Sequence, residues 1–204
     1  TGCGHHLHPT AGTIFHKSST SLRSWFYAIF MMASTRTGIS AKQLERELGV
    51  TYKTAWRMFT QVRKLMQEGD LTFFGKVEVD ETYIGGKDKN RHESKRSGSR
   101  GRGATGKTVA VALVERKGRA VAYVAPNVKA ETVIPMIQRH VPLSTGTIVY
   151  TDELPSYSGL TKLGYDHDFV QHAAKEYVSS GVHVNSVENL WSNIKRGIDG
   201  VHHS

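Results

Sequence analysis

The stretch Val77-Glu-Val-Asp-Glu-Thr-Tyr-Ile-Gly-Gly86 decides the fold expected for this chain. Its β-branched and aromatic residues predict a strand that ends near Asp80 and is followed by a Gly-Gly turn. A second run, Ile148-Val-Tyr-Thr-Asp-Glu153, closes on Asp152 in the same way, and Glu188 opens an amphipathic helical pattern. We therefore expect three acids from distant segments to meet at one end of a sheet, where carboxylates can hold divalent metal ions.

The composition of the 204 residues is that of a basic globular chain. Lys and Arg number 27 and Asp and Glu 18, a formal net charge of +9 at pH 7, which favours a polyanionic partner such as nucleic acid or an acidic membrane surface. There is no signal peptide, no apolar run near the roughly 20 residues that span a bilayer, and a single cysteine. These features predict a cytoplasmic protein without a membrane partner, and together with the acids they indicate phosphodiester chemistry on nucleic acid.

Residues 1–16 are polar and rich in histidine, with Cys3 in a Gly-Cys-Gly turn. A structural zinc site needs four ligands in tetrahedral order, and one cysteine with clustered histidines matches that need poorly. We interpret 1–16 as a frayed remnant of a zinc-ribbon-like segment whose other cysteines would precede Thr1. The abrupt end at Ser204 likewise suggests that the domain formed by residues 75–204 is C-terminally truncated.

Residues 17–70 have the periodicity of helices. Leu22–Ala33 is dense in aromatic and aliphatic residues, as in a buried helix. Ser40 begins a short helix through a capping box, and Gly49 ends it. Thr51 begins the next helix, whose apolar residues recur at helical spacing on one face.

Two helices joined by the turn at Gly49 have the helix-turn-helix pattern, in which the second helix contacts DNA. The residues of that helix that we expect to contact DNA are Lys53 and Arg57. The alternative is an ordinary helical hairpin with a solvated basic face.

From residue 75 to residue 204 the pattern is mixed α/β (α+β). The predicted strands are Lys76–Tyr83, Thr108–Glu115, Arg119–Ala125, Thr147–Thr151 and His167–Gln171, and the predicted helices are Ala130–His140 and Val187–Ile198. The first three strands follow one another without a helix, which favours an antiparallel meander, whereas helical patterns between the later strands favour parallel pairing. This order resembles that of a ribonuclease-H-like domain.

A basic, Gly- and Ser-rich segment, Lys87–Lys107, lies between the first two predicted strands. Such a segment cannot pack a core, and we expect it to contact DNA phosphates. The residues expected to make these contacts are Lys95, Arg96, Arg100 and Arg102. The alternative is a solvated hairpin loop.

Three motifs carry a resemblance to a known family: Asp80-Glu-Thr-Tyr-Ile-Gly-Gly-Lys87, Tyr150-Thr-Asp-Glu153 followed by Pro155-Ser-Tyr157, and His183-Val-Asn-Ser-Val-Glu-Asn-Leu-Trp191. They resemble the DDE transposases of bacterial insertion sequences, most of all the ISXO-like group. Upstream, the residues from Thr10 to Phe15 and from Gly38 to Trp56 resemble the zinc-ribbon tail and helix-turn-helix of that family. The resemblance therefore covers nearly the whole chain.

The resemblance implies that Asp80, Asp152 and Glu188 are the catalytic triad and hold two Mg²⁺ or Mn²⁺ ions. A gap of 35 residues separates the last two acids, a spacing common in such enzymes. It also implies that water frees a 3′-hydroxyl at the transposon end, and that this hydroxyl attacks a target phosphodiester. The implied partners are double-stranded DNA, as transposon ends and target, and further copies of the chain in a homo-oligomer at the nucleoid.

Each acid also has a structural explanation. Glu188 follows Asn185 by three residues, so the pair matches a helix capping box that needs no metal. Asp80 and Asp152 have acidic neighbours that compete for the same role, namely Glu78, Glu81 and Glu153.

Lys195 and Arg196 lie on the predicted last helix, where they are expected to touch DNA phosphates. Two other functions remain open at this point. A DNA-binding regulator would use the helix-turn-helix and need no metal, and a ribonuclease-H-like nuclease would cut DNA without joining a 3′-hydroxyl to new DNA.

Overall fold

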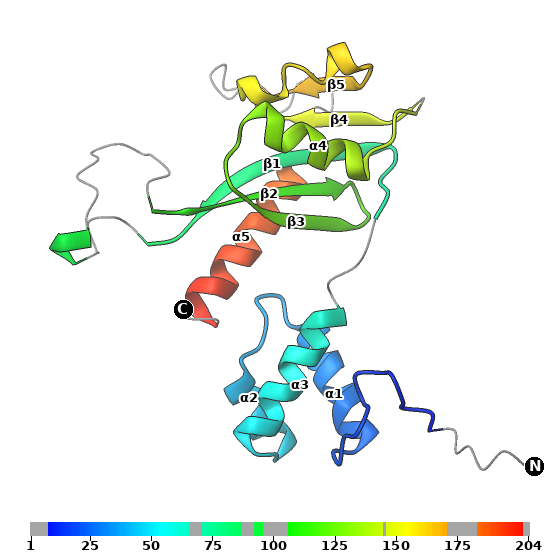
Figure 1. Cartoon of the computed structure of the whole chain (residues 1–204), viewed down its shortest axis with the longest axis vertical. Coiled ribbons are helices and arrows are strands. Elements are labelled where there is room, and N and C mark those ends of the chain that lie inside the picture. The colour runs from blue at the N-terminus through cyan, green and yellow to red at the C-terminus, as the bar shows by residue number, and fades with distance from the viewer. Residues whose placement is uncertain are drawn as a thin grey trace, which may run out of the picture. The chain divides into compact units, whose positions relative to one another are not determined.

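The computed structural model describes residues 8–65, 71–86, 92–95, 106–144, 146–170 and 183–201. The chain divides into two compact units, Asp70–Ser192 and a second that consists of Thr1–Gly69 with Asn193–Ser204. Figure 1 shows the sheet of the first unit and the helices of the second. None of the described helices is long and apolar enough to cross a membrane.

A five-stranded mixed sheet forms the centre of the first unit. In spatial order its strands are β3 (Ala120–Ala125), β2 (Thr108–Glu115), β1 (Lys76–Ile84), β4 (Ile148–Thr151) and β5 (Asp166–Phe169). β1, β2 and β3 pair antiparallel, whereas β4 runs parallel to β1 and β5 runs parallel to β4. The predicted meander followed by parallel strands is confirmed, and the fold is a mixed α/β domain of ribonuclease-H-like arrangement preceded by a helical region.

The connections explain these directions. β2 and β3 are joined by a short turn, which forces antiparallel pairing, whereas parallel strands need a longer crossover. α4 (Ala130–His140) supplies that crossover between β3 and β4. The connecting 3₁₀ turns are η2 (Glu93–Lys95), between β1 and β2, and η3 (Pro155–Tyr157) and η4 (Thr161–Leu163), between β4 and β5.

The two faces of β1 have different neighbours. Val77 and Val79 are fully buried in the hydrophobic core, to which α4 contributes. Because alternate residues of a strand point to opposite faces, Glu78 points to the other side. There it meets the first turn of α5 (Asn185–Gly200), so the two helices flank the sheet from opposite sides (Figure 1).

Several predicted boundaries differ from the structure by one or two residues, most of all in the last strand and the last helix. The last strand is Asp166–Phe169 rather than His167–Gln171, and Gln171 lies outside the described residues. The last helix begins two residues earlier than its apolar pattern predicts, at Asn185. The first turn of this helix is held by Glu78 on β1, and a pattern in the neighbouring sequence cannot show so distant a partner.

The helical unit forms at the predicted places. Its helices are α1 (Leu22–Ser34), α2 (Ala41–Leu48) and α3 (Tyr52–Leu65). Ser40 Oγ accepts the Gln43 N–H at 3.1 Å and caps α2, and Gly49, at a φ of 63°, ends it in the left-handed conformation. Trp25, Leu44 and Met58, one from each helix, are fully buried together in a separate core.

Candidate active site

Asp80 lies where β1 continues beyond its parallel partner. The pairing of β1 with β4 ends at Glu78 and Tyr150, whereas β1 continues to Ile84 against β2. Asp80 is therefore in the middle of a strand and not at its end, because β2 keeps the backbone extended. Asp152 directly follows β4. Both acids lie near the carboxyl end of the parallel pair, an edge where α/β sheets commonly bind ligands.

Three carboxylates meet at this edge of the sheet. Asp80, Glu81 and Asp152 each offer an oxygen atom, all three lie within 4.8 Å of one another, and all three residues are half-buried. The sequence suggests Glu81 only as a competitor of Asp80. Neighbouring residues of a strand point to opposite faces, so a local pattern does not predict that both join one group. Asp152 lies beyond the end of β4, so acids from both faces of β1 can reach it. We call Asp80, Glu81 and Asp152 the acid cluster.

Glu188, the third predicted acid, lies outside the acid cluster, but its charge acts on Asp80. It is in the first turn of α5, and its side chain is exposed. Its charge is one of the influences that raise the pKa of Asp80, so the two carboxylates are close enough to repel each other. Of the three acids predicted to form the triad, Glu188 is the one outside the group whose ligand atoms lie within 4.8 Å of one another.

The acids oppose one another's ionisation. Burial, with repulsion from Glu81, Asp152 and, more weakly, Glu188, raises the pKa of Asp80 to about 7. Burial and Asp152 also raise the pKa of Glu81. Partial desolvation and like charge both penalise the ionised forms, and a bound divalent cation would relieve both penalties. Clustered carboxylate oxygens are hard ligands that suit Mg²⁺ or Mn²⁺.

Hydrogen bonds orient two members of the cluster. The Tyr157 hydroxyl donates to Glu81 Oε2 at 2.8 Å, and the Leu154 N–H donates to Asp152 Oδ1 at 3.0 Å. Burial and the Glu81 charge raise the pKa of Tyr157, so this tyrosine stays a neutral donor. The sequence motif contained Tyr157, but no local pattern indicated its contact with a strand 76 positions away.

A pocket of about 260 Å³ opens beside Asp152 and is bordered by Ser158, His167 and Phe169. Burial lowers the pKa of His167, and its Nε2 lies 2.9 Å from Thr151 Oγ1. The pocket gives room next to the acids for part of a substrate.

The N-terminus of α5 is capped by Glu78. The alternative of a capping box between Asn185 and Glu188 is wrong, because the helix begins at Asn185 and the Glu188 N–H bonds to the Val184 carbonyl at 3.1 Å. Glu78 Oε2 accepts the Ser186 N–H at 2.7 Å instead. A carboxylate from a strand 108 positions away thus does the work of a local cap.

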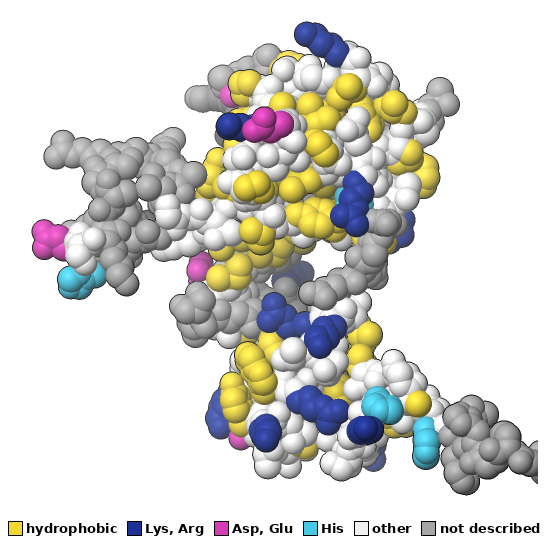
Figure 2. All heavy atoms as spheres, viewed as in Figure 1, with side chains coloured by type: hydrophobic (Ala, Val, Ile, Leu, Met, Phe, Trp, Pro, Cys, Tyr) yellow, Lys and Arg dark blue, Asp and Glu magenta, His cyan; other side chains and the backbone are white. Residues whose placement is uncertain are grey.

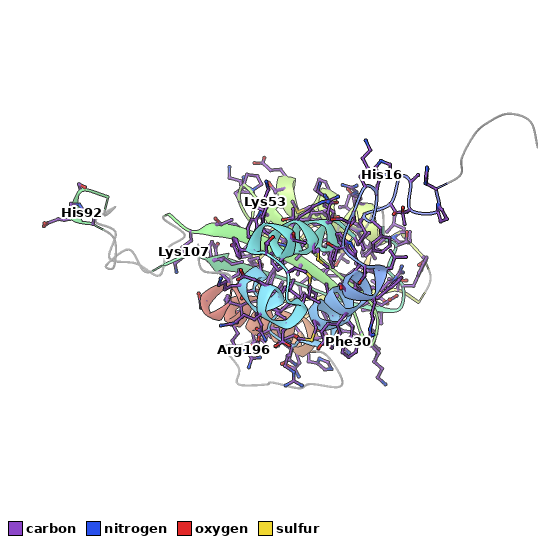
Figure 3. All side chains as sticks on the ribbon, turned by 90° about the horizontal axis from the view of Figure 1, so that it is seen from below. His16, Phe30, Lys53, His92, Lys107 and Arg196 are labelled. Atoms are coloured by element: carbon purple, nitrogen blue, oxygen red, sulfur yellow. The ribbon has the colours of Figure 1, made fainter. Side chains whose placement is uncertain are left out.

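The residues expected to bind DNA on helices are all exposed. Lys53 and Arg57 lie on α3, and Arg57 Nη2 donates to the His16 carbonyl at 3.0 Å. Lys195 and Arg196 lie on the second half of α5. Figure 3 marks Lys53 and Arg196, and Figure 2 shows Lys and Arg side chains gathered on the visible face of the helical unit.

The basic segment 87–107 is described only in part. Lys95 ends η2, whereas Arg96, Arg100 and Arg102 lie outside the described residues. Their contact with phosphate stays a prediction.

Comparison with known proteins agrees with the resemblance in the motifs. The ISXO2-like transposase domain matches residues 72–204. An uncharacterised protein in transposable element ISH50 of Halobacterium salinarum is 29% identical over 202 residues, which are 95% of this chain and 68% of that protein. An uncharacterised transposase-like protein of Haemophilus influenzae is 30% identical over 80 residues, which are 39% of this chain and 63% of that protein. The chain, with its acids at the edge of a ribonuclease-H-like sheet, belongs to the family of ISXO2-like transposases.

Proposed function

We propose that the chain cuts DNA at the ends of an insertion sequence and joins the freed ends to target DNA, in a reaction that depends on divalent metal ions. The observation that carries this proposal is the acid cluster in a basic member of a transposase family. Because its substrate would be chromosomal DNA that carries the insertion sequence, the protein would work in the cytoplasm, at the nucleoid.

The acids would hold the metal. Two Mg²⁺ or Mn²⁺ ions would be held by Asp80, Asp152 and Glu188. When bound, such ions stabilise the attacking and leaving oxygens of an in-line displacement. Asp80, with a pKa of about 7, gives up its proton when it becomes a ligand. Tyr157 would orient Glu81 within the acid cluster.

The reaction has two displacements at phosphorus. First, the oxygen of a water molecule attacks the phosphodiester at the transposon end, and the 3′ oxygen leaves and becomes a hydroxyl. This hydroxyl then attacks a target phosphodiester, a new phosphodiester bond forms, and the target 3′ oxygen leaves with a proton. The acid cluster must hold the attacking oxygen in line with the bond that breaks.

DNA binding would be divided between contacts to bases and contacts to phosphates. Lys53 and Arg57 on α3 would read the transposon end in the major groove. The phosphates would be neutralised by Lys95, Arg96, Arg100, Arg102, Lys195 and Arg196. Both transposon ends have to be held at once, so the active form would be a homo-oligomer on double-stranded DNA.

The test is an assay with a transposon-end duplex, a supercoiled target plasmid and Mg²⁺. We expect a 3′-hydroxyl on the end duplex and covalently joined products. Cleavage without joined products would favour the nuclease alternative. Specific binding without cleavage, also in Mn²⁺, would favour the DNA-binding regulator.

Binding measurements over a range of salt concentrations test the division of contacts. Changing Lys95, Arg96, Arg100 and Arg102 to Ala should weaken binding to all sequences alike and reduce the slope of log affinity against log salt by roughly 0.9 per lost phosphate contact. Arg57→Ala should instead reduce the preference for the cognate end, by about 1–3 kcal/mol if Arg57 pairs with guanine. Equal losses on all sequences from both changes would mean that α3 is only an electrostatic surface.

A further inference from the structure

A buried ion pair connects the elements that carry the acids. Glu78 on β1 is fully buried, and Arg116, directly after β2, donates from Nε to Glu78 Oε1 at 2.6 Å. Arg116 Nη2 also donates to the His183 carbonyl, at 2.6 Å, in the segment just before α5. On its third side the guanidinium lies 4.3 Å from the centre of the Tyr150 ring on β4. Arg116 thus contacts β1, β4 and the segment that leads into α5.

Glu78 completes the connection by holding the first turn of α5. Its Oε2 accepts the N–H groups of Ser186 and Val187 at 2.7 and 3.1 Å, and its Oε1 accepts the Ser186 hydroxyl at 3.1 Å. Val184 occupies the cap position and has no side-chain acceptor, so the helix depends on Glu78 for this role. A negative charge is also favourable at a helix N-terminus. His183 Nδ1 lies 3.3 Å from Oε1 and adds a positive neighbour when it is protonated.

On each of the three elements, one residue of this network lies two positions before an acid. Glu78 precedes Asp80 on β1, Tyr150 precedes Asp152 at the end of β4, and Ser186 precedes Glu188 on α5. Strand and helix backbones are stiff over two residues, so a fixed position at the pair fixes the backbone position of each acid. The position of Glu188 depends on the pair most of all, because Glu78 attaches the first turn of α5 to β1.

We propose that Glu78 and Arg116 are positioning residues, which set α5 against β1 and β4 so that Glu188 can share a metal ion with the acid cluster. This role rests on the proposed function, because it takes Glu188 to be a metal ligand. A pair that served stability alone would affect metal binding equally with or without Glu188. A positioning pair acts through Glu188, and its effect must disappear when Glu188 can no longer bind a cation.

A double-mutant cycle with Mn²⁺ alone as the probe separates these cases. The dissociation constant of Mn²⁺ is measured from the electron paramagnetic resonance signal of free Mn²⁺ for the wild-type chain, Glu78→Gln, Glu188→Gln and the double variant. Glu78→Gln keeps one acceptor oxygen for the N–H groups of α5 but turns a donor toward Arg116. Thermal unfolding in EDTA verifies that each variant is folded.

Glu115→Gln is the matched control. Like Glu78→Gln, it removes one negative charge, here from the neighbouring strand β2. Glu115 also resembles Glu78 in accepting a backbone N–H, because its Oε1 accepts the Phe74 N–H at 3.1 Å. We expect less than a threefold change in Mn²⁺ affinity for this control.

Glu78→Gln should weaken Mn²⁺ binding by about 10- to 100-fold, as for other residues that orient metal ligands, and by less than about threefold in the Glu188→Gln background. Equal weakening in both backgrounds would overturn the positioning role while the metal site itself stands. If Glu188→Gln binds Mn²⁺ as tightly as the wild type, Glu188 is not a metal ligand, and the positioning role is wrong as well. If Glu78→Gln does not fold, Arg116→Lys makes the same test, because it keeps the charge and loses the planar fork that reaches Glu78 and His183 together.

Discussion

Glu78 and Asp80 lie two residues apart on the same face of β1, yet their surroundings are opposite. Glu78 is fully buried and surrounded by donors: the guanidinium of Arg116, the Ser186 hydroxyl and the first N–H groups of α5. Asp80 is half-buried among acids that raise its pKa to about 7. The protein neutralises one carboxylate with its own groups and leaves the other to repel its neighbours.

The difference separates a structural charge from one that is ready for a ligand. A buried carboxylate with a full set of donors holds elements together, and removing it leaves those donors unsatisfied. A group of carboxylates that repel one another is strained until a cation arrives. Substitutions at the two positions should therefore have opposite effects.

The largest expected effect is on catalysis. Asp80→Asn removes a charge from a site that must neutralise two cations, so strand transfer in Mg²⁺ should fall by more than about 1,000-fold, while DNA binding stays near that of the wild type or improves. The measurement is joined product per unit time, with filter binding of the end duplex beside it. Asp166→Asn, on exposed β5, is the control and should keep wild-type rates. Retained transfer in Asp80→Asn would contradict the metal site.

Glu78 should matter for stability above all. Glu78→Ala leaves the mostly buried Arg116 without its carboxylate and leaves the first N–H groups of α5 without their acceptor, so the free energy of unfolding should fall by about 3–5 kcal/mol. Urea unfolding followed by circular dichroism measures this loss. The exposed Glu131 on α4 is the control, and Glu131→Ala should change stability by no more than about 0.5 kcal/mol. A loss below about 1 kcal/mol for Glu78→Ala would remove the contrast with Asp80.

Asp80→Asn should stabilise the metal-free protein, and the gain should depend on pH. The pKa of Asp80 in the folded chain is about 7, above the ordinary value near 4, so between these pH values the folded state binds a proton that the unfolded state has lost. Stability therefore falls as pH rises through this window, and the penalty is complete above about pH 7. Asn escapes the penalty, so the variant should gain on the order of 2 kcal/mol at pH 8 and almost nothing at pH 4.

Thermal unfolding in EDTA at several pH values measures this gain. A gain that is the same at pH 4 and pH 8 would come from packing and not from the charge of Asp80.

The smallest effect is stabilisation by the cation itself. At a free Mg²⁺ concentration ten times its dissociation constant, binding to the folded state should add about 1.4 kcal/mol. A rise in the melting temperature on Mg²⁺ addition measures it. Glu78→Gln should keep part of this rise, because the acid cluster remains, whereas Asp80→Asn should lose most of it. An equal rise in Asp80→Asn would mean that Mg²⁺ binds elsewhere.

Local patterns were enough to predict most of the elements. These patterns act within a few residues: the alternation around Val77 and Val79, the buried run of β2, and the caps at Ser40 and Gly49. The structure has the corresponding strands and helices at those places. Local sequence also places Asp152 directly after its strand, whereas Asp80 lies in the middle of β1 because the pairing with β2 extends that strand. Their meeting at one edge of the sheet follows from the parallel pairing of β1 with β4.

The sequence by itself thus determined the order of the elements and the basic character, because periodicity, caps and net charge are local or additive properties. Only the tertiary structure decided that Glu81 joins Asp80 and Asp152, that Tyr157 holds Glu81, and that Glu78 caps α5 in place of Asn185. The partners in these contacts come from distant segments, and their geometry depends on the pairing of β1 with β4 and the packing of α5 on the sheet. A carboxylate's role follows from the charges and donors around it, and those are assembled only when the chain folds.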